Sequence, residues 1–225
     1  MLASNALTTL ERMKLLLTPN TSPGVQTDLE PDSEVGQDDG WSECESMIVE
    51  LLINRASAMI EAQVGHHLAK ASYHQWYKAN GFQELVTLEW PIVSVERILE
   101  DGRLVDPSRY DYEQTGRLGI IYRDDGWLKA GYRHGLAYDM VALKRAIEVY
   151  YTAGYVLPKD ATEEDPQTLP ADLEGLVWDM VAQAWANLNN GSQGLTSFSI
   201  SDVSWHFDKQ TNPDWLRIIN LYRRY

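Results

Sequence analysis

The sequence predicts an α+β fold in which a small antiparallel β-sheet is inserted into a mainly helical core. Apolar residues recur every three or four positions in 42–64 and in 170–190, which is the period of an amphipathic helix. Between these segments, the stretch 72–156 contains short apolar and alternating runs divided by the turn dipeptides NG, DG and TG. The chain is 44% hydrophobic, which is ample for a buried core.

Two segments precede the predicted helix over 42–64. Leu7–Leu17 predicts a short amphipathic helix with Thr8 or Thr9 near its N-cap. The acidic linker 18–40 that follows is rich in Asp, Glu, Ser, Pro and Gly, and it has too few apolar residues to fold alone. Ser42 and Glu45 then have the spacing of a capping box, so a helix is expected to begin there and to end before Gly65.

The inserted region contains one clear hairpin and one clear last strand. In EDGRLV, Asp101 and Gly102 tolerate the positive φ angles that a tight hairpin requires. The β-branched and aromatic run at 149–152 suits a strand, and Gly154 is expected to end it. The segment 123–144 is less patterned, and we expect an extended loop there.

The helix over 170–190 follows Pro170 and is expected to pack against the helix over 42–64. A hairpin-like loop over 195–208 follows, because the alternation of apolar residues reverses phase at Ser201 and Asp202. The apolar members of this loop, a candidate contact between subunits or with a partner, are Phe198, Ile200, Val203, Trp205 and Phe207.

The C-terminal segment 212–225 predicts a short helix and tail, with Asn212 as the cap candidate and Pro213 at the first helical position. A helix of this length needs a surface on which to dock, and Arg and aromatic residues often anchor interfaces. The candidate partner-binding residues are Trp215, Leu216, Arg217, Ile219, Tyr222, Arg223, Arg224 and Tyr225.

Composition argues against several classes of function. The formal net charge of -14 opposes a broad phosphate-binding surface, since nucleic-acid affinity comes largely from Lys and Arg. One cysteine cannot form an internal disulfide framework, and no apolar run approaches the roughly 18 residues that span a bilayer. The sequence contains no nucleophile, base and orienter set and no metal-ligand spacing, so we expect no catalysis, no metal and no cofactor.

The order of elements and several short motifs resemble a known family, the head-to-tail connector, or head-completion adaptor, proteins of tailed bacteriophages. The resemblance covers most of 48–186 and rests on LLINRASAMIEAQVGHHL, LTLEWPIVSVERILEDGRLV, GRLGIIY, VYYTAGYVLP and LPADLEGLVWDMVAQAW. It implies that the run ending at Gly154 is the exit of the inserted sheet. The linker 18–40 and the loop 123–144 are longer than the family pattern.

The resemblance implies a structural virion protein that forms a homo-oligomeric ring, often a dodecamer, in the neck of the particle. Its partners would be the portal protein above and tail, stopper or tail-terminator proteins below, after assembly in the host cytoplasm. The genome would pass through the channel without specific binding, because an acidic lining repels phosphate. The C-terminal segment would face the portal, and no membrane is involved.

Three alternatives stay open at this stage. One is another neck or tail-completion protein, such as a stopper, although helical stripes on both sides of the sheet favour the adaptor. Another is a regulatory binding module of the host, which would work as a monomer or dimer. The third is a cell-wall hydrolase, but no pair of carboxylates stands apart from the solvated acids as a glycosidase requires.

Overall fold

This computed structural model describes residues 1–17, 40–114, 118–128, 132–133, 136–137, 145–191 and 213–223 of the chain. The described residues form helices and antiparallel strands, which confirms the predicted α+β class. They fall into two compact units: a helical unit, made of Met1–Gln63 and Leu169–Leu221, and a β unit, made mainly of Val64–Thr168. The acidic linker, apart from Gly40, and the hairpin-like loop 195–208 lie outside the described residues.

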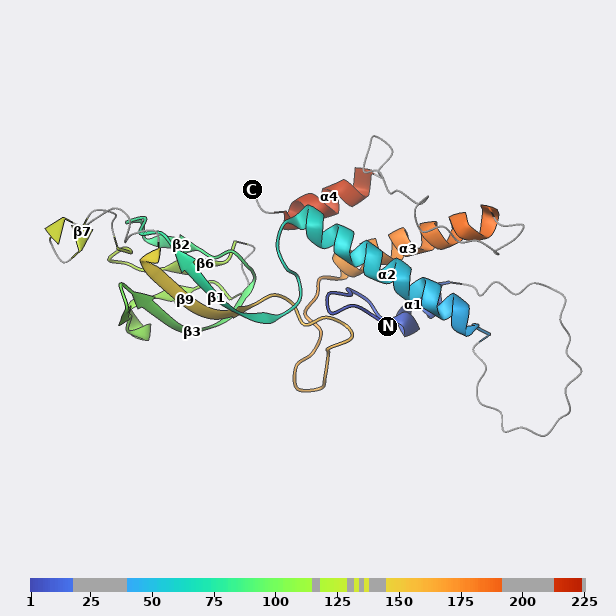
Figure 1. The fold of residues 1–225 in the computed structure, drawn as a ribbon, viewed down its shortest axis with the longest axis horizontal. Helices are drawn as coiled ribbons and strands as arrows, with labels where there is room; N and C mark the ends of the chain where they lie inside the picture. The colour runs from blue at the N-terminus through green and yellow to red at the C-terminus, as the bar shows by residue number, and fades with distance from the viewer. Residues whose placement is uncertain are drawn as a thin grey trace, which may run out of the picture. The chain divides into compact units, whose positions relative to one another are not determined.

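The helical unit contains α1 (Leu10–Leu16), α2 (Glu43–Val64), α3 (Ala171–Gly191) and most of α4 (Pro213–Tyr222). The predicted capping box is present, since the Glu45 N–H donates to Ser42 Oγ at 3.2 Å and the Ser42 N–H donates to the Glu45 carboxylate at 2.9 Å. In Figure 1, α2 and α3 run antiparallel, and Met59 and Met180 from the two helices line one small cavity.

Polar contacts fix the N-terminal segment to α3. The Thr9 side chain caps α1, and Thr8 Oγ1 donates to Glu174 Oε1 at 3.0 Å. The guanidinium of Arg12 donates to both oxygens of the same carboxylate, at 2.6 and 2.8 Å. Glu174 is only 4% exposed, so these donors replace the water that the carboxylate loses on folding.

The β unit contains two main sheets whose strands are all antiparallel. The four-stranded sheet has the order β1 (Ala71–Tyr77), β9 (Ile147–Ala153), β3 (Ile92–Glu100) and β4 (Arg103–Leu104). The three-stranded sheet has the order β2 (Glu84–Val86), β6 (Ile120–Tyr122) and β5 (Asp111–Tyr112). A 3-10 turn, Pro107–Arg109, precedes β5, and β7 (Tyr132–Arg133) pairs with β8 (Leu136–Ala137).

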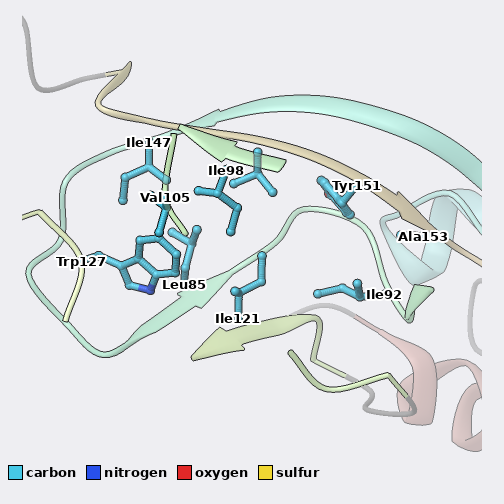
Figure 2. Packing of buried hydrophobic residues seen from close by; sticks show 10 residues of the cluster. Leu85, Ile92, Ile98, Val105, Ile121, Trp127, Ile147, Tyr151 and Ala153 are labelled. Carbon is cyan, nitrogen blue, oxygen red and sulfur yellow. The ribbon is translucent and has the colours of Figure 1, made fainter. Parts of the chain in front are cut away.

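The two main sheets pack face to face around one apolar core. Along β9, buried residues alternate with half-buried ones, as expected for a strand with one face in a core. In Figure 2, Leu85 and Ile121 from the three-stranded sheet point toward Ile98 and Ile147 of the four-stranded sheet. The buried members of this core are Leu85, Ile92, Ile98, Val105, Ile121, Trp127, Ile147, Val149, Tyr151 and Ala153.

The segment 123–144 is more structured at its start than the predicted extended loop. Trp127 is part of the β core, and the buried Arg123 donates to Glu100 at 2.8 Å and to Asp125 at 2.7 Å. The Trp127 ring and the paired Arg123 guanidinium order this part of the segment. Sequence periodicity does not reveal such contacts, because they are made by single residues. The short β7 and β8 pair also lies within this segment.

Both turn predictions in the β unit are confirmed. Asp101 and Gly102 have φ values of 54° and 74° and connect β3 to β4. Gly154 has a φ of 103° directly after β9, and its N–H donates to the Pro91 carbonyl at 2.9 Å. The next residue, Tyr155, donates to the Leu68 carbonyl, so the chain leaves the sheet along the segment that enters it.

Candidate interaction surfaces

The first surface is the exposed part of α4, which contains the predicted partner-binding stripe. The structure divides that stripe, because Trp215, Ile219 and Tyr222 are buried whereas Leu216 is 41% exposed. Arg217 and Arg223 are also exposed. The apolar side of the helix is therefore covered within this chain, and the exposed members of the predicted stripe are Leu216, Arg217 and Arg223.

Several predicted contact residues lie outside the described residues. These are the two C-terminal positions and the apolar members of the hairpin-like loop: Arg224, Tyr225, Phe198, Ile200, Val203, Trp205 and Phe207. Their role as contacts stays a prediction.

The second surface is the outer face of the four-stranded sheet, which we call the aromatic face. The register of the strands aligns its side chains in three rows across β3, β9 and β1. The rows are Ser94, Thr152 and Ser72; Arg97, Tyr150 and His74; and Leu99, Glu148 and Trp76. Because cross-strand neighbours on one face lie within contact distance, each row acts as a fixed group of side chains.

The central row is a stack. The rings of His74 and Tyr150 are parallel to within 9°, with centroids 4.1 Å apart. The guanidinium carbon of Arg97 lies 4.0 Å from the centroid of the same Tyr150 ring. A cation over an aromatic ring is attracted by the electrons of the ring, so Arg97 is held in place while it stays exposed.

Glu148 links the stack to the third row. His74 Nε2–H donates to Glu148 Oε1 at 2.5 Å, and the Tyr150 hydroxyl donates to the same oxygen. The hydrogen bond from Tyr150, followed by that from His74, holds the pKa of Glu148 below its ordinary value despite partial desolvation. Trp76, which stands opposite Glu148 and is 44% exposed, extends this face with an apolar ring.

Two β-bulges in β3 set this arrangement. Ile92 pairs with Ala153, but Ser94 pairs with Thr152 and Arg97 with Tyr150, so one extra residue is inserted at each of two places. A regular strand would bring Arg97 opposite Glu148. The bulges therefore direct the guanidinium onto the tyrosine ring rather than into a carboxylate pair.

Sequence reasoning missed the aromatic face. The run SYHQWYK predicts a strand, and the alternation of its residues was the available signal for one exposed face. The sequence does not reveal which strand pairs with this run or in which register.

Two further findings concern other classes of site. Within the described ranges, no group of three or more His, Cys, Asp or Glu side chains is arranged to hold a metal ion. No helix in the described part of the chain is sufficiently long and apolar to cross a membrane.

Solved structures share this fold. One is a chain from the neck of an empty gene transfer agent particle computed with C6 symmetry, with a TM-score of 0.51 and 15% identity over 100% of this chain and 93% of that chain. Another is a chain from the virion of a native gene transfer agent particle, with a TM-score of 0.50 and 14% identity over the same shares. No protein-family model and no curated protein matches the chain.

Proposed function

We propose that this protein is a structural component of the neck of a phage-like particle, a connector that joins the DNA-filled head to the tail. The observation that carries the proposal is the fold likeness over the whole chain to a neck chain of a gene transfer agent particle. The order of helices around an inserted sheet, which resembles the head-completion adaptors, supports it independently.

In this proposal, identical copies form a ring, with twelve as the expected number. The similar neck structure was computed with C6 symmetry, which supports a ring of identical copies. Twelve copies are compatible with a sixfold axis. The ring is in the virion neck and is assembled in the host cytoplasm. Its partners are the portal protein on one side and a tail, stopper or tail-terminator protein on the other.

The role is mechanical and non-enzymatic, with no cofactor. The net charge of -14 supports passage of the genome through the ring, since a surface without many free cations releases DNA that a basic lining would retain.

The portal contact is assigned to the exposed side of α4, with the loop 195–208 as a second contact. Leu216 and Arg217 are exposed on the same helix whose opposite side is buried, so the helix is held by its own chain and presents a fixed surface. The exposed arginines suit a portal surface that offers carboxylates.

The test is binding of purified protein to portal-containing heads that lack this protein. The double variant Arg217→Glu and Arg223→Glu should stay folded, because both side chains are exposed, and should lose binding to the heads. Arg145→Glu, a charge reversal of one exposed arginine in the β unit, is the control for each of the two single reversals and should bind like the wild type.

Two outcomes would count against parts of the proposal. If the double variant joins the heads as well as the control does, the contact lies elsewhere. If the wild-type protein binds isolated tails but not portal-containing heads, it is a tail-completion or stopper protein rather than the adaptor.

A further inference from the structure

The outer face of the three-stranded sheet differs in character from the aromatic face. Leu85 and Ile121 point into the core, so their strand neighbours point outward. Glu84, Tyr122 and Asp111 form one outward row across β2, β6 and β5. We call this surface the acidic face.

Carboxylates and exposed apolar side chains are mixed on the acidic face. Glu84, Asp111 and Glu113 are exposed, and no ion pair involves them in the described part of the chain. Exposed apolar residues continue from the row along both neighbouring chain segments: Val86 at 48%, Leu88 at 44% and Leu118 at 62%.

The aromatic face has the complementary composition. Arg97 stacks on Tyr150 and makes no salt bridge with any described carboxylate, although its charge helps to lower the pKa of the nearby Glu148. Its guanidinium stays exposed at the surface of the sheet. Its exposed apolar members are Trp76 and, at the end of the row that contains Leu99, Leu104 at 67%. The carboxylate of Glu148 is already held by His74 and Tyr150.

The two faces lie on opposite sides of one sandwich, because the sheets that present them share a single core (Figure 2). Two complementary patches on opposite sides cannot meet within one molecule, and they do not form a closed two-fold pair. They suit a head-to-tail contact, the kind that repeats from copy to copy and closes into a ring.

We propose that the aromatic face of one copy binds the acidic face of the next copy, with Arg97 received by the carboxylates of Glu84 and Asp111. This contact deepens the ring proposed above and rests on it. The occupant is a second copy because both halves of a complementary pair are present on one chain. The stack on Tyr150 orients Arg97 before contact, which lowers the entropy that association costs.

Charge reversal on each face tests the contact. Arg97→Glu brings carboxylates together across the contact, and Glu84→Arg brings cations together, so each variant alone should associate at least about tenfold more weakly than the wild type. Arg145→Glu and Glu163→Arg make equal charge changes at exposed positions outside both faces and should associate normally. Analytical ultracentrifugation measures association, and thermal unfolding checks that each variant is folded.

Mixing the two variants gives the sharper result. An Arg97→Glu chain keeps its acidic face, and a Glu84→Arg chain keeps its aromatic face, so each junction in an alternating array again pairs opposite charges. Association should therefore return when the two variants are mixed, although neither associates alone. This rescue requires that the aromatic face of one copy meets the acidic face of another, and because the two faces lie on opposite sides of the sandwich, such a contact is head-to-tail.

The outcomes separate this contact from the proposed function. If the Arg97→Glu variant and the Glu84→Arg variant each form rings as well as the wild-type protein does, the contact is overturned and the neck role stays intact. If mixing the two variants restores association but the wild-type protein binds no portal-containing heads, the contact is supported and the neck role is overturned. A wild-type protein that stays monomeric both alone and on heads would overturn the contact and the ring, while its binding to heads would still support the neck role.

Discussion

Gly154→Ala should destabilise the β unit strongly, because the added methyl group has no space at this position. The backbone φ of Gly154 is 103°, a conformation that side chains with a Cβ rarely adopt. A Cβ built there would lie 2.5 Å from the Ala69 carbonyl oxygen and 2.7 Å from its carbonyl carbon. Both are backbone atoms of the segment that enters the sheet, so no side-chain rotation relieves the contact.

Two costs add to give the expected magnitude. A residue held in a sparsely populated backbone region costs about 1–3 kcal/mol. Overpacking of a closed site costs about 1–3 kcal/mol more, through backbone shifts. Gly154→Ala is therefore expected to lower the free energy of unfolding by about 2–6 kcal/mol, measured by urea denaturation with circular dichroism.

Two other glycines separate these costs. Gly65 has a φ of 85° but no atom within 4 Å of an added Cβ, so Gly65→Ala should lose only the backbone part, about 1–3 kcal/mol. Gly175 lies within α3 with the same open space, and Gly175→Ala should stabilise the helix by about 0.5–1 kcal/mol. A Gly154→Ala variant no less stable than Gly65→Ala would show that the close approach to Ala69 is wrong.

Three further predictions concern charge. Arg12→Ala should lower the free energy of unfolding by about 1–3 kcal/mol in urea denaturation, since it removes donors from the buried Glu174, and Glu174→Gln in the same chain should recover part of the loss. Tyr150→Phe should raise the pKa of Glu148 in an NMR titration, and an unchanged pKa would contradict the hydrogen bond. Because the folded-state pKa of Glu148 is lowered, the stabilisation by Glu148 is present above its ordinary pKa and is lost as the pH falls through the folded value. Association of copies should strengthen as the salt concentration rises from a low value to about 0.15 M, because the screening length falls to about 8 Å and the repulsion between copies of net charge -14 is reduced. Association that only weakens with salt in sedimentation velocity would refute this prediction.

Local chemistry made part of the fold predictable. The capping box at Ser42 and the hairpin at Asp101 and Gly102 depend on residues within a few positions of one another, and the structure contains both. The end of β9 at Gly154 is of the same kind, since a single residue type permits the turn. Helical periodicity likewise gave α2 and α3, because each buries one face.

The candidate surfaces depend on distant residues and were less predictable. Periodicity groups Trp215, Ile219 and Tyr222 on one side of α4, but it does not say whether that side meets a partner or the chain's own core, and the structure buries it. The position of Arg97 over Tyr150 depends on two bulges in β3, and extra residues in a strand leave no sequence signal beyond an irregular alternation.

The overall charge of the chain and the local charge of its faces have opposite effects on a ring. Copies with a net charge of -14 repel one another at long range, and the same acidity favours release of DNA from a channel. Association therefore has to come from a contact in which a few cations are positioned before the copies meet. Arg97 meets this requirement, because its stack on Tyr150 holds the guanidinium at the surface and the bulges of β3 place it opposite Tyr150 rather than opposite Glu148. A regular β3 would place Arg97 opposite Glu148, and the guanidinium would then be paired within its own sheet instead of being available to the proposed acidic neighbour.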